Sequence, residues 1–381
     1  MMFTRKSSRN FAHFVAAGSC ALIAACSSES AGPPQPDASS ANDVAVVHDR
    51  VITLDTHVDI PFDFATDAAA PLDGDLQVNL ETMQSGGLDV GFFIVYVGQT
   101  ERTPENYVQA QVDAMTKFDA IHRMTDRLHS DLIGFAHTAA DVERIAGEGR
   151  LVAAIGIENG YVIGRELDLL DRYYALGARY MTLVHNGHND IADSAQPRPQ
   201  FGDDGPEHAG VSEFGAQVIE RMNDLGMMVD VSHASKEAAL EAIALSRAPV
   251  IASHSSVHAL TGHVRNMDDE TMMALRANGG VIQIVAFQSY LGDPERNDDA
   301  TVSELVDHID YAVNLIGIDY VGISSDFGGG GGIAGWNGAG ETQNVTAELL
   351  ERGYSEADIA KIWSGNLLRV WHEVEQAAAT D

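Results

Sequence analysis

The chain has 381 residues, of which 45% are hydrophobic, and carries a formal net charge of −33 at pH 7. This length and apolar content suffice for a full buried core, and they fit either one large α/β barrel or two ordinary domains. A chain this acidic repels nucleic acid and anionic lipid headgroups, so we exclude nucleic-acid binding and expect any carboxylate-bearing ligand to need a dedicated local cation.

The first 25 residues predict an export signal. Three basic residues precede the apolar run FVAAGSCALIAA, which is too short and too rich in alanine for a stable membrane span. The run ends in IAAC at residues 23–26, which resembles the lipobox of bacterial lipoproteins, where the Cys is lipidated and becomes the new N-terminus. We therefore expect Cys26 to carry a lipid anchor. The alternative is an ordinary signal peptide cut at an A-x-A-like site.

Residues 26–43 predict a flexible tether after the lipidated Cys, because SSESAGPPQPDASSAND contains almost nothing apolar. Ser27 resembles the residue that sends such lipoproteins to an outer membrane, so we expect an exported protein held on a bacterial membrane, facing the periplasm or the surface. The only cysteines are Cys20 and Cys26, so the mature chain has no disulfide available.

Eight apolar runs of strand length follow in residues 44–381. They are VITLD (51–55), GFFIVYV (91–97), LVAAIGIE (151–158), ARYMTLVH (178–185), GMMVDVSH (226–233), APVIASH (248–254), GGVIQIVA (279–286) and YVGISSD (320–326). Strands that are apolar on both faces are typical of a parallel sheet covered on both sides.

Segments with helical spacing separate these runs. The clearest lie at 104–124, 212–225, 236–246, 268–279 and 302–317, and several end at or just before a Gly. Alternating strands and helices imply a parallel sheet, and eight strands over roughly 330 residues favour one closed (β/α)8 barrel of the TIM type over a doubly wound sheet. We see no second domain in residues 44–381.

The ends of these strands are unusually polar, and functional groups of such barrels come from the carboxyl ends of strands. The polar residues there are His57 and Asp59, Glu158, His185, His233, His254 and Asp326. A single His at a strand end is more often a hydrogen-bonded residue than a ligand, but four of the fifteen His end apolar strands together with carboxylates.

Imidazoles and carboxylates without thiolates suit Zn²⁺ or a similar divalent ion. Their number favours two metals bridged by one carboxylate, for which Glu158 lies in the middle of the set.

Several motifs, in order, closely resemble the membrane (renal) dipeptidases, in particular their bacterial members. They are GIENG, MTLVHNGHNDIADS, GMMVDVSHAS, PVIASHSSVHAL, VRN, SSDFGGGGG and GNLLRVW, and the resemblance runs from about Val51 to Trp371. The resemblance implies a (β/α)8 barrel whose binuclear zinc centre hydrolyses dipeptides. We further expect dipeptides with a C-terminal D-residue to be among the substrates.

Matching motif to motif, the resemblance implies that one zinc is held by His57, Asp59 and Glu158. Glu158 bridges to the second zinc, which His233 and His254 also hold.

The resemblance also implies the catalytic residues. Two Zn²⁺ ions sharing a water hold a hydroxide against the scissile carbonyl, and Asp326 passes its proton to the leaving amine. His185 contacts substrate and stabilises the oxyanion. Arg265 binds the terminal carboxylate and so excludes longer peptides.

One position departs from the family pattern. The family commonly reads DFDG where this chain has Asp326, Phe327, Gly328 and Gly329, so a second carboxylate is missing. If that Asp only shapes a turn, Gly328 replaces it readily. If it tunes Asp326 or touches substrate, activity or specificity shifts. We favour the turn interpretation.

Two alternatives stay open at this point. The first is another binuclear-metal amidohydrolase acting on cyclic amides or lactams, although such enzymes typically begin with His-x-His and often use a carboxylated Lys, and none of the four lysines here ends a strand. The second is a surface-anchored binding lipoprotein with a degenerate site. Helices on a barrel exterior can also pack as a homodimer, but no apolar stripe identifies such a contact.

Overall fold

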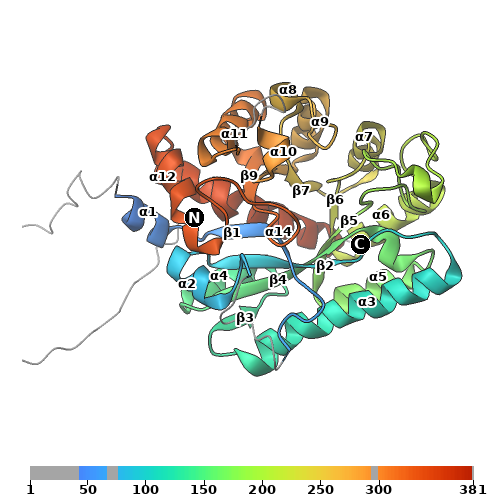
Figure 1. Cartoon of the computed structure of the whole chain (residues 1–381), viewed down its shortest axis with the longest axis horizontal. Coiled ribbons are helices and arrows are strands. Elements are labelled where there is room, and N and C mark those ends of the chain that lie inside the picture. The colour runs from blue at the N-terminus through green and yellow to red at the C-terminus, as the bar shows by residue number, and fades with distance from the viewer. Residues whose placement is uncertain (1–42, 67–75, 293–298, 380–381) are drawn as a thin grey trace, which may run out of the picture.

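The computed structural model describes residues 43–66, 76–292 and 299–379. Its centre is a parallel sheet in which eight strands follow the order β1-β2-β4-β5-β6-β7-β8-β9 (Figure 1). The strands are β1 Leu54–Asp59, β2 Val90–Tyr96, β3 Ile133–Phe135, β4 Leu151–Glu158, β5 Ala178–Thr182, β6 Met228–Asp230, β7 Ile251–Ser255, β8 Val281–Val285 and β9 Val321–Ser324.

The first and last strands bring the sheet round into a nearly closed barrel. The backbone N–H of Asp59 donates to the carbonyl of Phe327 over 2.8 Å, and Val58 forms a parallel bridge with Phe327. The predicted (β/α)8 barrel is confirmed, with all eight predicted strands in its wall.

The strands differ from the prediction in several details. The predicted strands 178–185 and 226–233 end at Thr182 and Asp230, so His185 and His233 lie in the loops that follow. The first strand runs from Leu54 to Asp59 instead of 51–55, so it contains His57 and Asp59. The short β3 was not predicted, because its three residues are too few to show a periodic pattern. It pairs with the first three residues of β4, next to the stretch of β4 that pairs with β5.

Helices surround the barrel (Figure 1). Those longer than one turn are α1 Val44–Arg50, α2 Leu80–Gly86, α3 Pro104–Arg123, α4 Ala139–Gly147, α5 Asp168–Ala175, α6 Glu213–Leu225, α7 Lys236–Leu245, α9 Asp269–Asn278, α11 Val302–Ile316, α12 Gln343–Glu351, α13 Glu356–Ala360 and α14 Asn366–Ala378; α8 His258–Thr261 and α10 Gln288–Leu291 are single turns. All five helices predicted from spacing are present within one or two residues.

Local sequence explains where these helices start and stop. Thr301 and Glu304 form a reciprocal capping box at the start of α11, which satisfies two backbone donors there. Gly226 ends α6 with a φ of 78°, a left-handed conformation that favours glycine.

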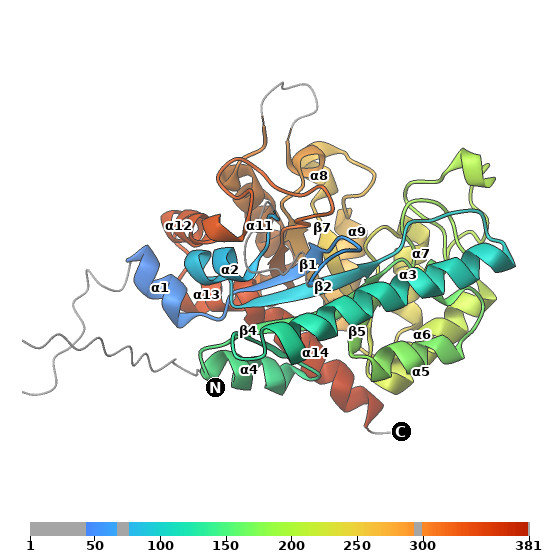
Figure 2. The ribbon, with the colours of Figure 1, turned by 60° about the horizontal axis from the view of Figure 1, so that its bottom comes forward.

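The amino-terminal end of the barrel is filled by apolar side chains and covered by α14. Phe92 of β2 lies with its ring centre 5.4 Å from that of Tyr180 in β5 and 5.5 Å from that of Trp371 in α14. All three side chains are buried, and Figure 2 shows α14 passing under the strands. The carboxyl ends of the strands lie at the opposite end of the barrel from α14.

None of the helices in residues 43–66, 76–292 and 299–379 combines the length and apolar content of a membrane span. The predicted signal, the lipidated Cys26 and the tether up to residue 42 lie outside the described residues.

Candidate active site

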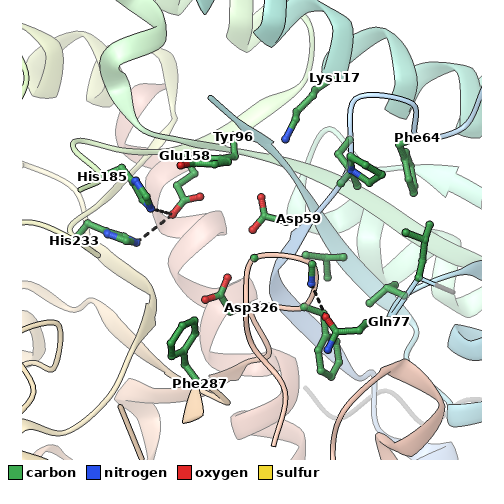
Figure 3. A pocket seen from close by; sticks show the side chains of 18 of the residues that line it. Asp59, Phe64, Gln77, Tyr96, Lys117, Glu158, His185, His233, Phe287 and Asp326 are labelled. Carbon is green, nitrogen blue, oxygen red and sulfur yellow. Dashed lines mark hydrogen bonds and ion pairs between the residues drawn. The ribbon is translucent and has the colours of Figure 1, made fainter. Parts of the chain in front are cut away.

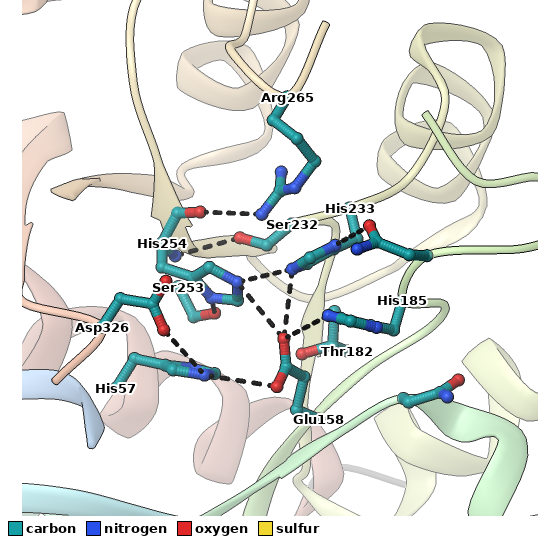
Figure 4. A network of polar contacts seen from close by, with 12 residues as sticks. His57, Glu158, Thr182, His185, Ser232, His233, Ser253, His254, Arg265 and Asp326 are labelled. Carbon is teal, nitrogen blue, oxygen red and sulfur yellow. Dashed lines mark hydrogen bonds and ion pairs between the residues drawn. The ribbon is translucent and has the colours of Figure 1, made fainter. Parts of the chain in front are cut away.

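All eight residues predicted for the site lie together at the carboxyl ends of the barrel strands. Six different strands, or the loops directly after them, supply seven of these residues, and the eighth follows α8. They are His57, Asp59, Glu158, His185, His233, His254, Arg265 and Asp326, and Figure 4 shows most of them around Glu158. The pattern of polar strand ends therefore located one continuous cluster.

His57 and Asp59 point to the same side of β1, because residues two apart in a strand share a face. The Nε2 atom of His57 lies 3.5 Å from Oδ2 of Asp59. His57 Nε2 and Asp59 Oδ1 are both buried without a hydrogen-bond partner among the described residues. Such buried polar atoms are costly unless something else satisfies them.

Glu158, the last residue of β4, is the centre of the cluster. Its Oε2 lies 3.6 Å from Nε2 of His57, and its Oε1 lies 3.1 Å from Nε2 of His233. Oε1 also lies 3.5 Å from Nε2 of His254 and 3.6 Å from Nε2 of His185. One oxygen of the carboxylate thus faces His57 and the other faces the remaining three imidazoles, as a bridging ligand would.

Hydrogen bonds behind the imidazoles decide which ring nitrogen carries the proton. The hydroxyl of Tyr180 donates to the carbonyl of Thr56 over 2.9 Å, so it accepts from Nδ1 of His57, which lies 3.0 Å away. The Oδ1 atom of Asn186 lies 3.2 Å from Nδ1 of His233 and can only accept. In both rings Nδ1 therefore carries a proton and Nε2 faces the cluster, where a neutral ring presents its lone pair.

His254 is held in the same way. Ser253 donates its hydroxyl to Oδ2 of Asp230 over 2.6 Å, so its oxygen accepts from Nδ1 of His254 at 2.8 Å. The Nε2 atoms of His233 and His254 lie only 2.8 Å apart, with both protons committed elsewhere. Two lone pairs this close repel each other unless a cation lies beside them, and imidazoles anchored through their second nitrogen are typical of metal ligands.

The titration behaviour of the cluster supports a cation site. Burial lowers the pKa of His233 and of His254 well below the ordinary value, so both rings are neutral. Burial alone would raise the pKa of Glu158, but His185 and His57 hold it well below its usual range. Burial also opposes protonation of His57, yet Glu158 and Asp59 raise its pKa well above the ordinary value. The carboxylates thus produce a field that favours positive charge at the centre. Three overlapping groups of ligand atoms here could hold a metal ion.

His233 and Asp326 hold their positions with a strained backbone. Their φ angles are 66° and 59°, in the left-handed region that side chains other than Gly rarely adopt. Conformations of this kind cost about 1–3 kcal/mol and persist where the surroundings fix them, often at functional sites. Burial, together with Asp59 and Glu158, raises the pKa of Asp326 well above its ordinary value.

Arg265 is buried beside the imidazoles, although an Arg in a loop is by default exposed. Its Nη2 donates to the carbonyl of His254 over 3.2 Å, and its Cζ lies 5.5 Å from the ring centre of Tyr290. Its Nε is buried without a partner among the described residues. This guanidinium therefore keeps free capacity to bind an anion.

A cavity of about 480 Å³ opens over the cluster (Figure 3). Asp59, Glu158, His185, His233 and Asp326 form its floor, while Phe64, Tyr96, Phe287 and Tyr290 are among its walls. Its volume suits a small molecule a few residues long at most.

The comparisons with known proteins agree with this geometry. The model of the membrane dipeptidase family (peptidase family M19) matches residues 41–381. The chain belongs to the membrane dipeptidase family. It is 36% identical to dipeptidase tcpJ of Claviceps purpurea over 328 residues, which cover 84% of this chain and 75% of the relative. It is 35% identical to dipeptidase aclJ of Aspergillus oryzae over 307 residues, covering 79% and 71% respectively.

Solved structures give the same answer. The crystal structure of the probable dipeptidase PvdM from Pseudomonas aeruginosa superimposes with a TM-score of 0.84 at 34% identity, covering 90% of this chain and 100% of that one. This member of the membrane dipeptidase family is a metal-dependent dipeptidase, which confirms the predicted family, fold and enzyme class.

Several residues that shape this dipeptidase site were not predicted. Tyr180 holds the imidazole of His57 from behind, and Asn186 holds that of His233. Ser253, whose hydroxyl donates to Asp230, holds that of His254. Asp230 could have been noticed in the sequence, because a carboxylate inside the apolar run GMMVDVSH is unusual. Tyr180 could not, because a tyrosine is ordinary in a buried strand.

Gly328 replaces the second Asp of the family motif, and its surroundings support the turn interpretation. Its φ is 79°, and its N–H donates to Oε1 of Gln77 over 2.8 Å. A Cβ atom there would lie 2.5 Å from the carbonyl oxygen of Asp59. In this chain the loop therefore passes so close to β1 that only glycine fits without a shift.

Proposed function

We propose that this dipeptidase hydrolyses the peptide bond of dipeptides, including those with a C-terminal D-residue, with two zinc ions. His57 and Asp59 hold the first ion, His233 and His254 hold the second, and Glu158 bridges them. The observation that carries the proposal is the 2.8 Å separation of the Nε2 atoms of His233 and His254, whose protons lie on the opposite nitrogens. Neutral imidazoles and carboxylates without a thiolate are the ligands expected for catalytic zinc.

A bound pair of zinc ions acidifies a water molecule, so that hydroxide is available near neutral pH, and polarises the scissile carbonyl. Asp326 lies with Oδ1 3.9 Å from Nε2 of His57 and has a pKa raised by burial, which suits a group that takes a proton and gives it up again. We assign to it the transfer of that proton to the leaving amine.

We assign to His185 the stabilisation of the oxyanion that forms on the attacked carbonyl. Its Nε2 lies 3.6 Å from Oε1 of Glu158, and its ring centre lies 4.2 Å from that of His233, so the imidazole stands at the edge of the cluster facing the cavity. A positioned donor at this place stabilises negative charge as it develops on the attacked carbonyl.

We assign to Arg265 the binding of the substrate's terminal carboxylate. Its buried Nε without a partner, together with the bidentate geometry of a guanidinium, favours such an anion. A carboxylate fixed there allows one residue on each side of the attacked bond, which restricts hydrolysis to dipeptides.

The test is hydrolysis of L,L and L,D dipeptides beside a tripeptide, with zinc added and then with a chelator. We expect release of free amino acids from the dipeptides only, and its loss with the chelator and in Glu158→Gln. Glu220→Gln, an exposed position of α6, is the matched control and should retain activity. Two zinc ions per chain by elemental analysis would support the stoichiometry. Turnover that resists the chelator, or intact activity in Glu158→Gln, would refute the assignment.

We propose in addition that the protein is exported and anchored to a bacterial membrane through lipid on Cys26. The basic start, the apolar run and the IAAC sequence at 23–26 support this. Labelled fatty acid should be incorporated into the wild-type protein and not into Cys26→Ser. Equal labelling of both would contradict the anchor.

A further inference from the structure

Lys117 is a buried lysine at the edge of the active-site cavity. It lies on α3 with 4% of its surface exposed, although lysine is almost never buried without a partner. Its ammonium has no hydrogen-bond or ion-pair partner among the described residues. Figure 3 shows the amine pointing from α3 toward the cavity, above Asp59.

The surroundings of Lys117 are aromatic. Its Nζ lies 5.1 Å from the ring centre of Phe62 and 5.5 Å from that of Tyr96. These rings stabilise a cation weakly and cannot replace a carboxylate. Burial lowers the pKa of Lys117, whereas the charges of Asp59 and then Glu158 act in the opposite direction. Both carboxylates are assigned to metal binding above, so neither is free to pair with the lysine.

Lys117 lies on the side of the cavity opposite to Arg265. In Figure 3 the side chains of Lys117 and Phe287 stand on opposite sides of the central carboxylates. The ring of Phe287 stacks on that of Tyr290 at 4.3 Å, and Tyr290 lies 5.5 Å from the guanidinium carbon of Arg265. Lys117 therefore lines one side of the cavity, and Arg265 lies behind the aromatic residues that line the other side.

We propose that Lys117 binds the side-chain carboxylate of an acidic N-terminal residue, so that the enzyme prefers dipeptides that begin with Glu or Asp. The inference rests on the proposed dipeptidase function. If the terminal carboxylate lies at Arg265 and the scissile carbonyl over Glu158, the first residue of the substrate extends toward Lys117. A carboxylate there completes the pairing of a buried ammonium, while a neutral side chain leaves it unpaired.

The net charge of the chain gives a second reason for such a cation. At −33 the protein repels a dipeptide with an extra carboxylate, so binding it requires a local positive group for each acidic end. Arg265 serves one end and Lys117 the other.

The test compares kcat/KM for Glu-Ala and for the uncharged isostere Gln-Ala. We expect the wild-type ratio to favour Glu-Ala, and the ratio to fall about 10- to 100-fold in Lys117→Met, as removal of a hydrogen bond to a charged group predicts. Lys117→Arg keeps the charge and should retain part of the preference. Lys361→Met, a half-buried lysine paired with Asp319 away from the cavity, is the matched control and should keep the wild-type ratio.

The outcomes separate this inference from the function on which it rests. If the wild type cleaves Gln-Ala but shows a ratio of one or less, the preference is refuted without any variant. An equal preference in Lys117→Met and wild type would refute the role of the lysine. If no dipeptide is cleaved at all, the proposed function fails and this inference falls with it.

Discussion

His308 should make the stability of this protein depend on pH. This residue of α11 is buried, and its Nδ1 accepts a hydrogen bond from the backbone N–H of Val257 over 3.0 Å. Burial lowers its pKa to about 4, against a hydrogen bond to the backbone of Leu291 that acts in the opposite direction. The neutral ring thus holds the backbone of Val257, the residue before α8, in the segment that leads to Arg265.

The sign and size of the effect follow from the difference between the folded and unfolded pKa values. The unfolded chain protonates this His near pH 6.5 and the folded one only near 4, so stability is complete above about pH 6.5 and is lost as the pH falls toward 4. At about 1.4 kcal/mol per pH unit the full loss is about 3 kcal/mol, of which about 2 kcal/mol is lost between about pH 7.5 and about pH 5.

The assay is urea unfolding of wild type and His308→Gln at several pH values, with chelator present so that acid-driven release of metal does not contribute. A comparison with the variant is needed because Asp55 acts in the opposite sense: burial raises its pKa to about 6, so its contribution to stability grows as the pH falls. His308→Gln removes the titration and retains an acceptor for Val257. We expect the wild-type and variant free energies of unfolding to converge as the pH falls.

His308→Leu is the second variant. It leaves the buried N–H of Val257 without an acceptor, which should cost about 1–3 kcal/mol at every pH. A difference between wild type and His308→Gln that stays constant from neutral to acid pH would refute the reasoning, because it would mean that the folded protein accepts the proton as readily as the unfolded chain.

Three further predictions concern the site. Arg265→Met should lower kcat/KM about 10- to 100-fold, chiefly through KM, as loss of a charge-assisted contact predicts, and steady-state kinetics on one dipeptide measures it. Gly328→Ala should destabilise the fold by about 1–3 kcal/mol in thermal unfolding, since it forces a side chain into a left-handed turn against the carbonyl of Asp59; an unchanged melting temperature would contradict the turn interpretation. Tyr180→Phe should weaken zinc binding about 10-fold in a competition titration, because the Nδ1 proton of His57 loses its acceptor.

The sequence pattern located the residues that stand at the ends of strands. Glu158 and His254 follow continuous apolar runs, and parallel strands bring their carboxyl ends to one edge, so their proximity could be predicted without coordinates. The resemblance to a known family then assigned their roles. Arg265 depended on that resemblance, because nothing in a loop sequence signals that a guanidinium will be buried.

The parts that could not be predicted depend on packing between distant elements. Lys117 lies in a helix with ordinary amphipathic spacing, and only the position of α3 against β2 and the loop after β1 shows that its amine reaches the cavity. Tyr180 likewise acquires its role from the register that places its hydroxyl behind His57. Residue type and local period carry no information about such contacts.

The pairing of the first strand with the last has a consequence for how the protein matures. Asp59 is fixed by the carbonyl of Phe327, and the residues around Glu158 come from strands spread along almost the whole chain. Contacts between such distant segments form slowly, because a long loop must close before they contribute. An incomplete chain that lacks β9 has neither Asp326 nor the closure that fixes Asp59. We therefore expect a chain that ends before β9 to lack both the proposed proton-transfer group and a fixed Asp59, and so to be inactive.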